Sequence, residues 1–211
     1  MVFSEDVTLD KQILRTVGGL GWPGSQPGCV VIIAEEERII AEPNKYERKI
    51  LYHLLDEFEN WDLDILIRTA TDLSAKHNCQ GIYARLTHQP GVDYLQTFNK
   101  LAMQEKRGFF YLQAAPHTHE EHLRLGAIEF HLNLIRRYLH PAQKRLVLGD
   151  TKLIGYLQDI PREVTLLKDL DCPAVAALGY ALAHLVQTEG WDEQQAYLIQ
   201  EHELRLMHGD D

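Results

Sequence analysis

The sequence predicts a mixed α/β fold, in which one sheet is antiparallel at its start, parallel afterwards, and flanked by helices. The first observation is a series of short apolar, β-branched segments near the N-terminus, separated by turn residues as in a strand meander. The second is that later segments with helical spacing of apolar residues alternate with short apolar runs. Strands that alternate with helices are typical of parallel pairing.

The meander is expected to contain three strands, at residues 12–19, 29–34 and 38–42. A turn rich in glycine and proline, residues 18–28, separates the first two strands. The run at 29–34 is apolar throughout, as in a strand that is covered on both faces. Three consecutive glutamates at 35–37 interrupt it. Because charge runs usually point to water, we expect a solvated β-turn there rather than a metal site.

Two helices are expected after the meander, through Ile50–Phe58 and Leu63–Leu73, because their apolar residues repeat at helical spacing. Short apolar or aromatic runs predict further strands at 81–84, 109–112 and 146–148. The remaining helices are expected at 93–103, at 118–138, after a cap at Asp150 or Thr151, from Pro173 onward, and at 191–206. The alanines that follow the proline would let that helix pack closely on the sheet.

The length and composition predict one main domain. The 211 residues, of which 45% are hydrophobic and 25% charged, suffice to bury a core. We expect this domain at residues 1–188 and a C-terminal helical extension at 189–211. The extension is expected to dock on its own domain, and an interaction helix for a partner or a second copy is the alternative. The sequence predicts no particular oligomeric state.

The charge balance bears on possible partners. The formal net charge is −10, from 31 acidic and 21 basic residues. DNA binding through phosphates needs a basic face, so this balance does not support a DNA-binding role. The tight basic pairs Arg136–Arg137 and Lys144–Arg145 are expected to be solvated helix surface.

The cysteines and the hydropathy pattern indicate a cellular compartment. Cys29, Cys79 and Cys172 are widely spaced and form no CxxC, which fits reduced thiols in a cytoplasm. A nucleophilic pair of Cys172 with His184 is excluded, because twelve residues of helix separate the two by ~18 Å. No signal peptide opens the chain, and no apolar run approaches the ~20 residues of a membrane span. We expect a cytoplasmic protein without membrane contact.

Four segments, in this order, resemble the nuclease domain of phage terminase large subunits. Gly19–Ile32 resembles the opening, where that family has Gly-x-Asp-x-Gly-Gly-x-x-Pro between two strands. Cys79–Arg85 resembles the strand that ends in a second acid, and residues 144–160 resemble a short strand with its following helix. Residues 171–182 resemble the closing helix, where the family has an Asp-Asp pair and a further Asp three residues on. The resemblance spans roughly residues 13–185 and implies an RNase H-like fold.

The departures from the family pattern concern its catalytic acids. In that family, clustered carboxylates hold two divalent metals for phosphodiester cleavage, because such hard cations need oxygen ligands. The first acidic position falls on Gly21, and the second on Arg85, whose charge would repel a metal. The third set falls on Cys172, Pro173 and Ala176. The resemblance therefore implies no catalytic residues and no metal cofactor at these positions.

The leading hypothesis is a catalytically inactive, terminase-nuclease-like domain with a binding or regulatory role in phage or prophage DNA packaging or processing. Its expected partners are proteins. The sequence has no G-x-x-x-x-G-K-[ST] loop, so it carries no ATPase motor of that type.

Two alternatives remain open. One is an active endonuclease dependent on Mg²⁺ or Mn²⁺, which would take its carboxylates from Asp93, Asp169 and Asp171. The other is a metal-binding protein that uses His117, His119 and His122. For these histidines we favour an ordinary polar loop and helix start, because clustering alone does not set tetrahedral geometry.

Overall fold

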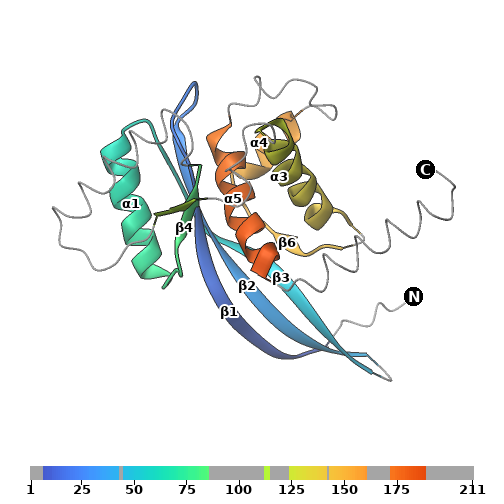
Figure 1. Ribbon diagram of the computed structural model, residues 1–211. Coiled ribbons are helices and arrows are strands. Elements are labelled where there is room, and N and C mark those ends of the chain that lie inside the picture. The colour runs from blue at the N-terminus through green and yellow to red at the C-terminus, as the bar shows by residue number, and fades with distance from the viewer. Residues whose placement is uncertain are drawn as a thin grey trace, which may run out of the picture.

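The computed structural model (Figure 1) describes residues 7–42, 45–85, 112–114, 124–141, 143–160 and 172–188. In this part of the chain, six strands form one sheet in the order β5-β4-β1-β2-β3-β6. The strands are β1 (Val7–Gly21), β2 (Gly28–Glu42), β3 (Lys45–Asn60), β4 (Ile82–Ala84), β5 (Leu112–Ala114) and β6 (Leu146–Val147). β1, β2 and β3 pair antiparallel, whereas β4 on β1, β5 on β4 and β6 on β3 pair parallel. The predicted mixed sheet is confirmed, but the strands expected at 29–34 and 38–42 form one strand, β2, and the third strand of the meander is β3.

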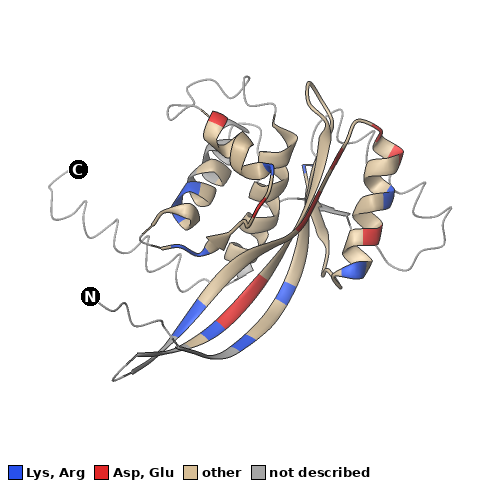
Figure 2. Cartoon of the chain, turned by 180° about the vertical axis from the view of Figure 1, so that it is seen from behind, with Lys and Arg blue, Asp and Glu red and all other residues tan. Residues whose placement is uncertain are grey.

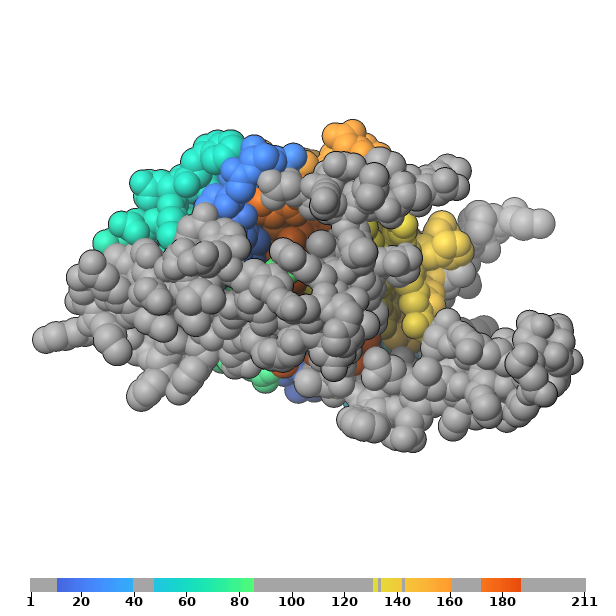
Figure 3. Space-filling model, turned by 45° about the horizontal axis from the view of Figure 1, so that its top comes forward, coloured from blue at the N-terminus to red at the C-terminus, as the bar shows by residue number. Residues whose placement is uncertain are grey.

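Helices cover both faces of this sheet (Figure 1). On one face, α1 (Leu63–Lys76) packs over a small core that includes Leu20, Ile32 and Ile82. On the other face, α3 (Arg124–Leu139), α4 (Leu153–Asp159) and α5 (Pro173–Thr188) enclose the larger core. α5, which has several fully buried side chains, is seen between the β1–β2 turn and α3 in Figure 3.

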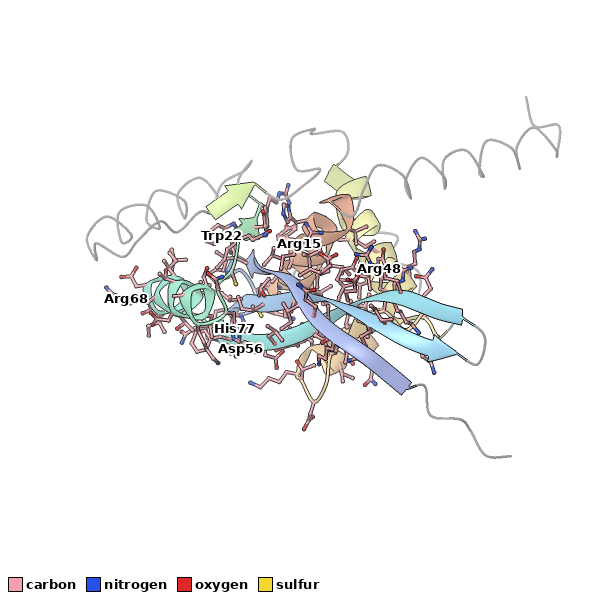
Figure 4. All side chains as sticks on the ribbon, turned by 90° about the horizontal axis from the view of Figure 1, so that it is seen from below. Arg15, Trp22, Arg48, Asp56, Arg68 and His77 are labelled. Carbon is pink, nitrogen blue, oxygen red and sulfur yellow. The ribbon has the colours of Figure 1, made fainter. Side chains whose placement is uncertain are left out.

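α1 forms where the sequence predicts a helix, and two local features hold it in place. The side chain of Asp62 accepts a hydrogen bond from the Ile65 N–H at 3.0 Å, which caps the N-terminus. At the other end, Lys76 Nζ and His77 Nε2 lie 2.7 and 3.1 Å from the carboxylate of Asp56 on β3 (Figure 4). The helix is therefore attached to the edge of β3 by charge as well as by its apolar face.

The expected helix at Ile50–Phe58 is wrong, because these residues lie in β3. In the pairing of β2 with β3, Leu54 is opposite Ile33 and Asp56 is opposite Ile32, so Leu55 is an extra residue. This bulge moves the alternation by one: Leu54 packs on the α5 side, whereas Phe58 packs on the α1 side. The shifted alternation imitates helical spacing in the sequence.

The expected solvated turn at residues 35–37 is also wrong, because these glutamates lie within the continuous strand β2. Glu35 and Glu36 are buried, with 4% and 2% of their surface exposed. Glu35 forms an ion pair with Arg15 of β1. Glu36 forms ion pairs with Lys11, at 2.7 Å, and with Arg38. These cations offset the cost of removing the carboxylates from water.

Some of the other expected helices and strands lie in the part of the chain that the structure describes, and the rest lie outside it. β4, β6 and α5 form where they are expected, and Pro173 begins α5 as predicted. Of the run at 109–112 only Leu112 is described, in β5; the expected helix at 118–138 is described as α3. The cap of α4 is not at Asp150 or Thr151 as expected, because Lys152 is the N-cap residue and makes no side-chain cap hydrogen bond. The Thr151 hydroxyl, one residue earlier, accepts a hydrogen bond from the Leu153 N–H at 3.1 Å. The expected helices at 93–103 and 191–206, and hence the extension at 189–211, lie outside the described residues.

The three meander strands, β1, β2 and β3, are much longer than the strands that pair with them on either side. β1, β2 and β3 have 15, 15 and 16 residues, whereas β4 pairs with β1 only through Gly18–Leu20. Their far ends extend beyond the helices, and Figure 2 shows acidic and basic residues along this open stretch. No helix among the described residues is long and apolar enough to span a membrane.

Candidate functional site

The positions at which the terminase nuclease family has its acidic residues, according to the resemblance in the sequence, lie at one end of the sheet. Gly21 is the last residue of β1, and Arg85 directly follows the neighbouring parallel strand β4. The indole N–H of Trp22 donates to the Arg85 carbonyl oxygen at 2.7 Å, which joins the two strand ends. Cys172 and Pro173 lie at the start of α5, above Gly21. We call this end of the sheet the acid-position end.

α5 lies directly on the backbone of β1 at this end. A Cβ atom added to Gly21 would lie 2.0 Å from the Pro173 carbonyl oxygen, 2.6 Å from its carbon and 2.8 Å from the Pro173 Cα. A Cβ on Gly19 would lie 1.9 Å from the carbonyl oxygen of Ala177. All these atoms belong to backbone, so no side-chain rotation relieves the overlap. A residue with any side chain at position 21 requires α5 to move away from the sheet.

The residues at the acid-position end do not fit a pair of Mg²⁺ or Mn²⁺ ions. Gly21 offers no ligand and no room for one. Arg85 contributes a positive charge, and neither Pro173 nor Ala176 has a side-chain donor. Cys172 offers a soft sulfur where hard cations prefer oxygen. In the described part of the chain, no group of three or more His, Cys, Asp or Glu side chains is placed to hold a metal ion.

Two carboxylates on β3 lie close to this end, and the sequence did not predict them. Gly21, Cys29 and Glu59 are opposite one another across β1, β2 and β3, and Glu57 lies two residues before Glu59 on the same face. Their signal in the sequence is the alternation Glu-x-Glu of a strand. The mistaken helix at residues 50–58 concealed that alternation.

Both carboxylates are occupied by α4. Glu57 accepts hydrogen bonds from the Thr151 hydroxyl and from the Lys152 N–H, the latter at 3.0 Å. Glu59 accepts from the Tyr156 hydroxyl at 3.2 Å. Burial, with this hydrogen bond to Glu59, raises the pKa of Tyr156 to about 12, so the phenol stays a donor. The two glutamates therefore attach α4 to β3 rather than forming an open ligand set.

Two of the thiols, Cys29 near this end and Cys79 before the opposite end of β4, are poor nucleophiles. Cys29 is 1% exposed, and burial, followed by the nearby charges of Glu59 and Glu57, raises the pKa of its thiol well above the ordinary value. Burial also raises the pKa of Cys79 to about 11. None of the cysteines forms a disulfide, in agreement with the expected reduced thiols. Because the thiolate is the reactive form, these groups are not set up for nucleophilic catalysis.

A second polar group lies on the α5 face of the sheet, further along the same helix. The Tyr83 hydroxyl and His184 Nε2 form a hydrogen bond of 2.8 Å, and the two rings stack with centroids 3.7 Å apart. Burial, together with the charge of Arg15, lowers the pKa of His184 to about 4, so the imidazole is neutral at pH 7. Arg15 pairs with Glu35 and donates to the Leu185 carbonyl at 2.7 Å. This group holds the C-terminal half of α5 against three strands.

Sequence reasoning missed the Tyr83–His184 pair, because 101 residues separate its members and no local pattern joins them. The remaining residues singled out from the sequence lie outside the described part of the chain: Asp93, Asp169, Asp171, His117, His119 and His122.

No protein-family model matches the chain, and a search of curated proteins found no similar protein.

Proposed function

We propose that this chain is a catalytically inactive RNase H-like domain, related to the nuclease half of phage terminase large subunits, with a binding or regulatory role in phage or prophage DNA packaging or processing. The mixed sheet supports the proposal, because an antiparallel meander followed by parallel strands is the arrangement that the resemblance implies. The acid positions support it further. Gly21, Arg85 and Cys172–Pro173 come from distant parts of the sequence and lie at one end of the sheet.

The contact between Gly21 and Pro173 is the main observation that supports a catalytically inactive domain. An aspartate at position 21 would need the space that the Pro173 carbonyl occupies. The site is thus filled by backbone, in addition to having lost its acidic residues. A domain that keeps the fold without the metal-ligating residues still has its surface, through which it can bind other molecules. We therefore propose binding, rather than catalysis, as its function.

The test is a titration of the full chain with Mg²⁺ and with Mn²⁺ by calorimetry, beside cleavage of supercoiled plasmid at millimolar metal. We expect neither saturable metal binding nor cleavage. Metal-dependent cleavage that is abolished by Asp171→Asn would overturn the proposal in favour of an endonuclease with carboxylates at Asp93, Asp169 and Asp171. An unaltered rate in that variant, together with cleavage, would indicate a contaminating nuclease, which a repeated purification separates from the chain.

A further inference from the structure

Two of the three cysteines lie on the same face of the sheet, at the acid-position end. Cys29 is opposite Gly21 in the pairing of β1 with β2, and it belongs to the larger core on the α5 side. Cys172 directly precedes α5 and packs against the same core. The third cysteine, Cys79, packs against the smaller core on the α1 side. The sheet therefore separates Cys79 from the other two thiols.

Gly21 brings the start of α5 next to Cys29. A Cβ added to Gly21 would lie 2.8 Å from the Cα of Pro173, and Cys172 is the residue before that proline. Opposite Cα atoms in an antiparallel pair are ~4.5–5.5 Å apart, so Cys29 is the immediate neighbour of Gly21 on β2. Because Gly21 has no side chain, position 21 places nothing between the Cys29 thiol and the start of α5.

Electrostatic interactions also join the two thiols. Burial is the main effect that raises the pKa of Cys29, followed by the charges of Glu59 and Glu57. A charge on Cys172 raises the pKa of Cys29 further. The phenol of Tyr156, whose hydroxyl donates to Glu59 at 3.2 Å, interacts with both sulfurs. Side chains from β2, from α4 and from the residue before α5 therefore converge at this point.

The two thiols differ in their access to solvent. Cys29 is 1% exposed, and its Sγ lies 3.6 Å from the Val30 carbonyl oxygen. Cys172 is half-buried, and its carbonyl accepts from the Ala176 N–H at 3.0 Å, which places it at the start of a 16-residue helix. The N-terminal end of a helix stabilises a nearby anion, and the thiolate is the form that a peroxide oxidises. An oxidant from solvent therefore meets Cys172 first, and Cys29 lies behind it.

Packing explains Cys29 but not Cys172. A buried cysteine acts as a small apolar residue, which is sufficient reason for Cys29. The residue before the first turn of a helix is usually serine, threonine, aspartate or asparagine, whose oxygen accepts from the helix N–H groups. A half-buried thiol at position 172 suits neither this cap nor the core. A solvent-accessible thiol beside a second, buried thiol is the arrangement of redox-sensitive cysteine pairs.

We propose that Cys29 and Cys172 form a reversible disulfide bond when the chain meets hydrogen peroxide. The Cys172 sulfur attacks the O–O bond and becomes a sulfenic acid, while the other oxygen leaves as water with the thiol proton. The Cys29 sulfur then attacks the Cys172 sulfur, and the sulfenic hydroxyl leaves as a second water with the Cys29 proton. Two thiols and one peroxide thus give one disulfide and two waters. A dithiol reverses the reaction and is itself oxidised to a disulfide. The proposal does not rest on the proposed function, since it concerns these two thiols alone.

The bond would fasten the start of α5 to β2. Cys29 and Cys172 are 172 − 29 = 143 residues apart in the sequence. Cross-links that close long loops restrict the unfolded chain most strongly. The oxidised chain should therefore melt at a temperature higher by about 5–15 °C, and reduction with dithiothreitol should restore the original value.

The test is treatment of the full chain with increasing hydrogen peroxide, followed by catalase, alkylation in denaturant and mass spectrometry. We expect a chain lighter by about 2 Da, a tryptic peptide pair that links Cys29 with Cys172, and an alkylated Cys79. The burial that raises the pKa of Cys29 slows its attack, so the bond should form faster as the pH rises from about 6 to 9. A chain unfolded in urea should show no preference for this pair.

Three variants separate the roles of the thiols. Cys172→Ser should abolish the intramolecular disulfide. Cys29→Ala should leave a sulfenic acid on Cys172, which dimedone traps, and circular dichroism checks that this core variant folds. Cys79→Ser is the matched control, because it removes a thiol from the opposite face of the sheet, and it should be oxidised as the wild type is.

Several results would overturn the proposal. One is oxidation of Cys172 to a sulfinic acid while Cys29 remains alkylatable. Another is a disulfide that joins two chains, or one that includes Cys79 in equal yield. The same conclusion would follow if the Cys29–Cys172 pair formed only after unfolding, or if the Cys172→Ser variant lost the same mass as the wild type.

Discussion

Replacing Gly21 with alanine is the most direct perturbation of the contact between β1 and α5. The added methyl group would lie 2.0 Å from the Pro173 carbonyl oxygen, where ordinary contact begins at 3.4 Å. The shortfall is 3.4 − 2.0 = 1.4 Å. Since the obstacle is helix backbone, α5 as a whole must shift by a comparable amount.

That shift would disturb the larger core, because α5 contributes several fully buried side chains to it: Ala177, Leu178, Ala181, Leu182, Ala183 and Leu185. Overpacking of a core costs about 1–3 kcal/mol, and an immovable backbone obstacle places this variant at the upper end. A loss of about 3 kcal/mol is large against a total stability of ~5–15 kcal/mol. For a chain of this size it lowers the melting temperature by about 6–12 °C.

The assay is unfolding in urea, followed by circular dichroism, with Gly155→Ala as the control. Gly155 lies in the short helix α4 and an added Cβ there meets nothing within 4 Å. Alanine at that position should raise the free energy of unfolding by about 0.5–1 kcal/mol, because glycine is unfavourable within helices. The same glycine-to-alanine substitution is thus expected to lower the free energy of unfolding at position 21 and to raise it at position 155.

Gly21→Asp extends the test to the chemistry. Its Cβ meets the same Pro173 carbonyl, so we expect a destabilised protein with no gain in Mg²⁺ or Mn²⁺ binding. The reasoning is refuted if Gly21→Ala unfolds within about 0.5 kcal/mol of the wild type, the range of an ordinary surface substitution. Metal binding by a folded Gly21→Asp variant would equally refute it.

Three further predictions concern the polar groups that hold the helices. Burial lowers the pKa of His184 from 6.5 to about 4, so between these pH values the unfolded chain binds more protons than the folded chain. The stability that the neutral imidazole contributes is therefore complete above pH 6.5 and is lost as the pH falls to 4. In the His184→Gln variant, the urea midpoint should vary less with pH across this range. Glu57→Ala removes the acceptor for the Lys152 N–H and should cost about 1–2 kcal/mol in urea unfolding, whereas Glu57→Gln keeps an acceptor and should cost less; equal losses would contradict the assignment. Glu36→Ala leaves three basic side chains around a missing carboxylate and should cost about 2–4 kcal/mol, and a thermal melt unchanged from the wild type would exclude a structural role for that cluster.

The sequence predicted the elements whose pattern is local. α1 and α5 have their signals within a single segment: apolar residues at helical spacing for α1, and Pro173 followed by alanines for α5. The mixed sheet followed from the alternation of helices and strands. The prediction for β3 was wrong because Leu55 is an extra residue opposite β2. The pairing that creates this bulge involves residues that are distant in the sequence.

The buried glutamates show a similar limit for the candidate site. Glu35 is stable in the interior only because Arg15 reaches it from β1, a partner 20 residues away. The same holds for Tyr83 and His184, and for Glu57 with α4. The resemblance implies that Gly21, Arg85 and Cys172 lie near one another, and the structure places them at one end of the sheet. It did not anticipate that the backbone of α5 fills the space, since that contact depends on the packing of a helix against a strand.

The excess length of the meander strands has a consequence for how the molecule opens. Residues 17–21 of β1 are buried beneath α5, whereas residues 11–14 of the same strand are exposed beyond the helices. The amide protons of one continuous strand therefore differ in protection: those near Val7 exchange with solvent through local fraying, and those near Gly21 exchange only when the whole core opens. Strand separation should start at the ends formed by Val7, Glu42 and Lys45 and proceed toward the helices, so that hydrogen exchange along β1 records the order in which this fold comes apart.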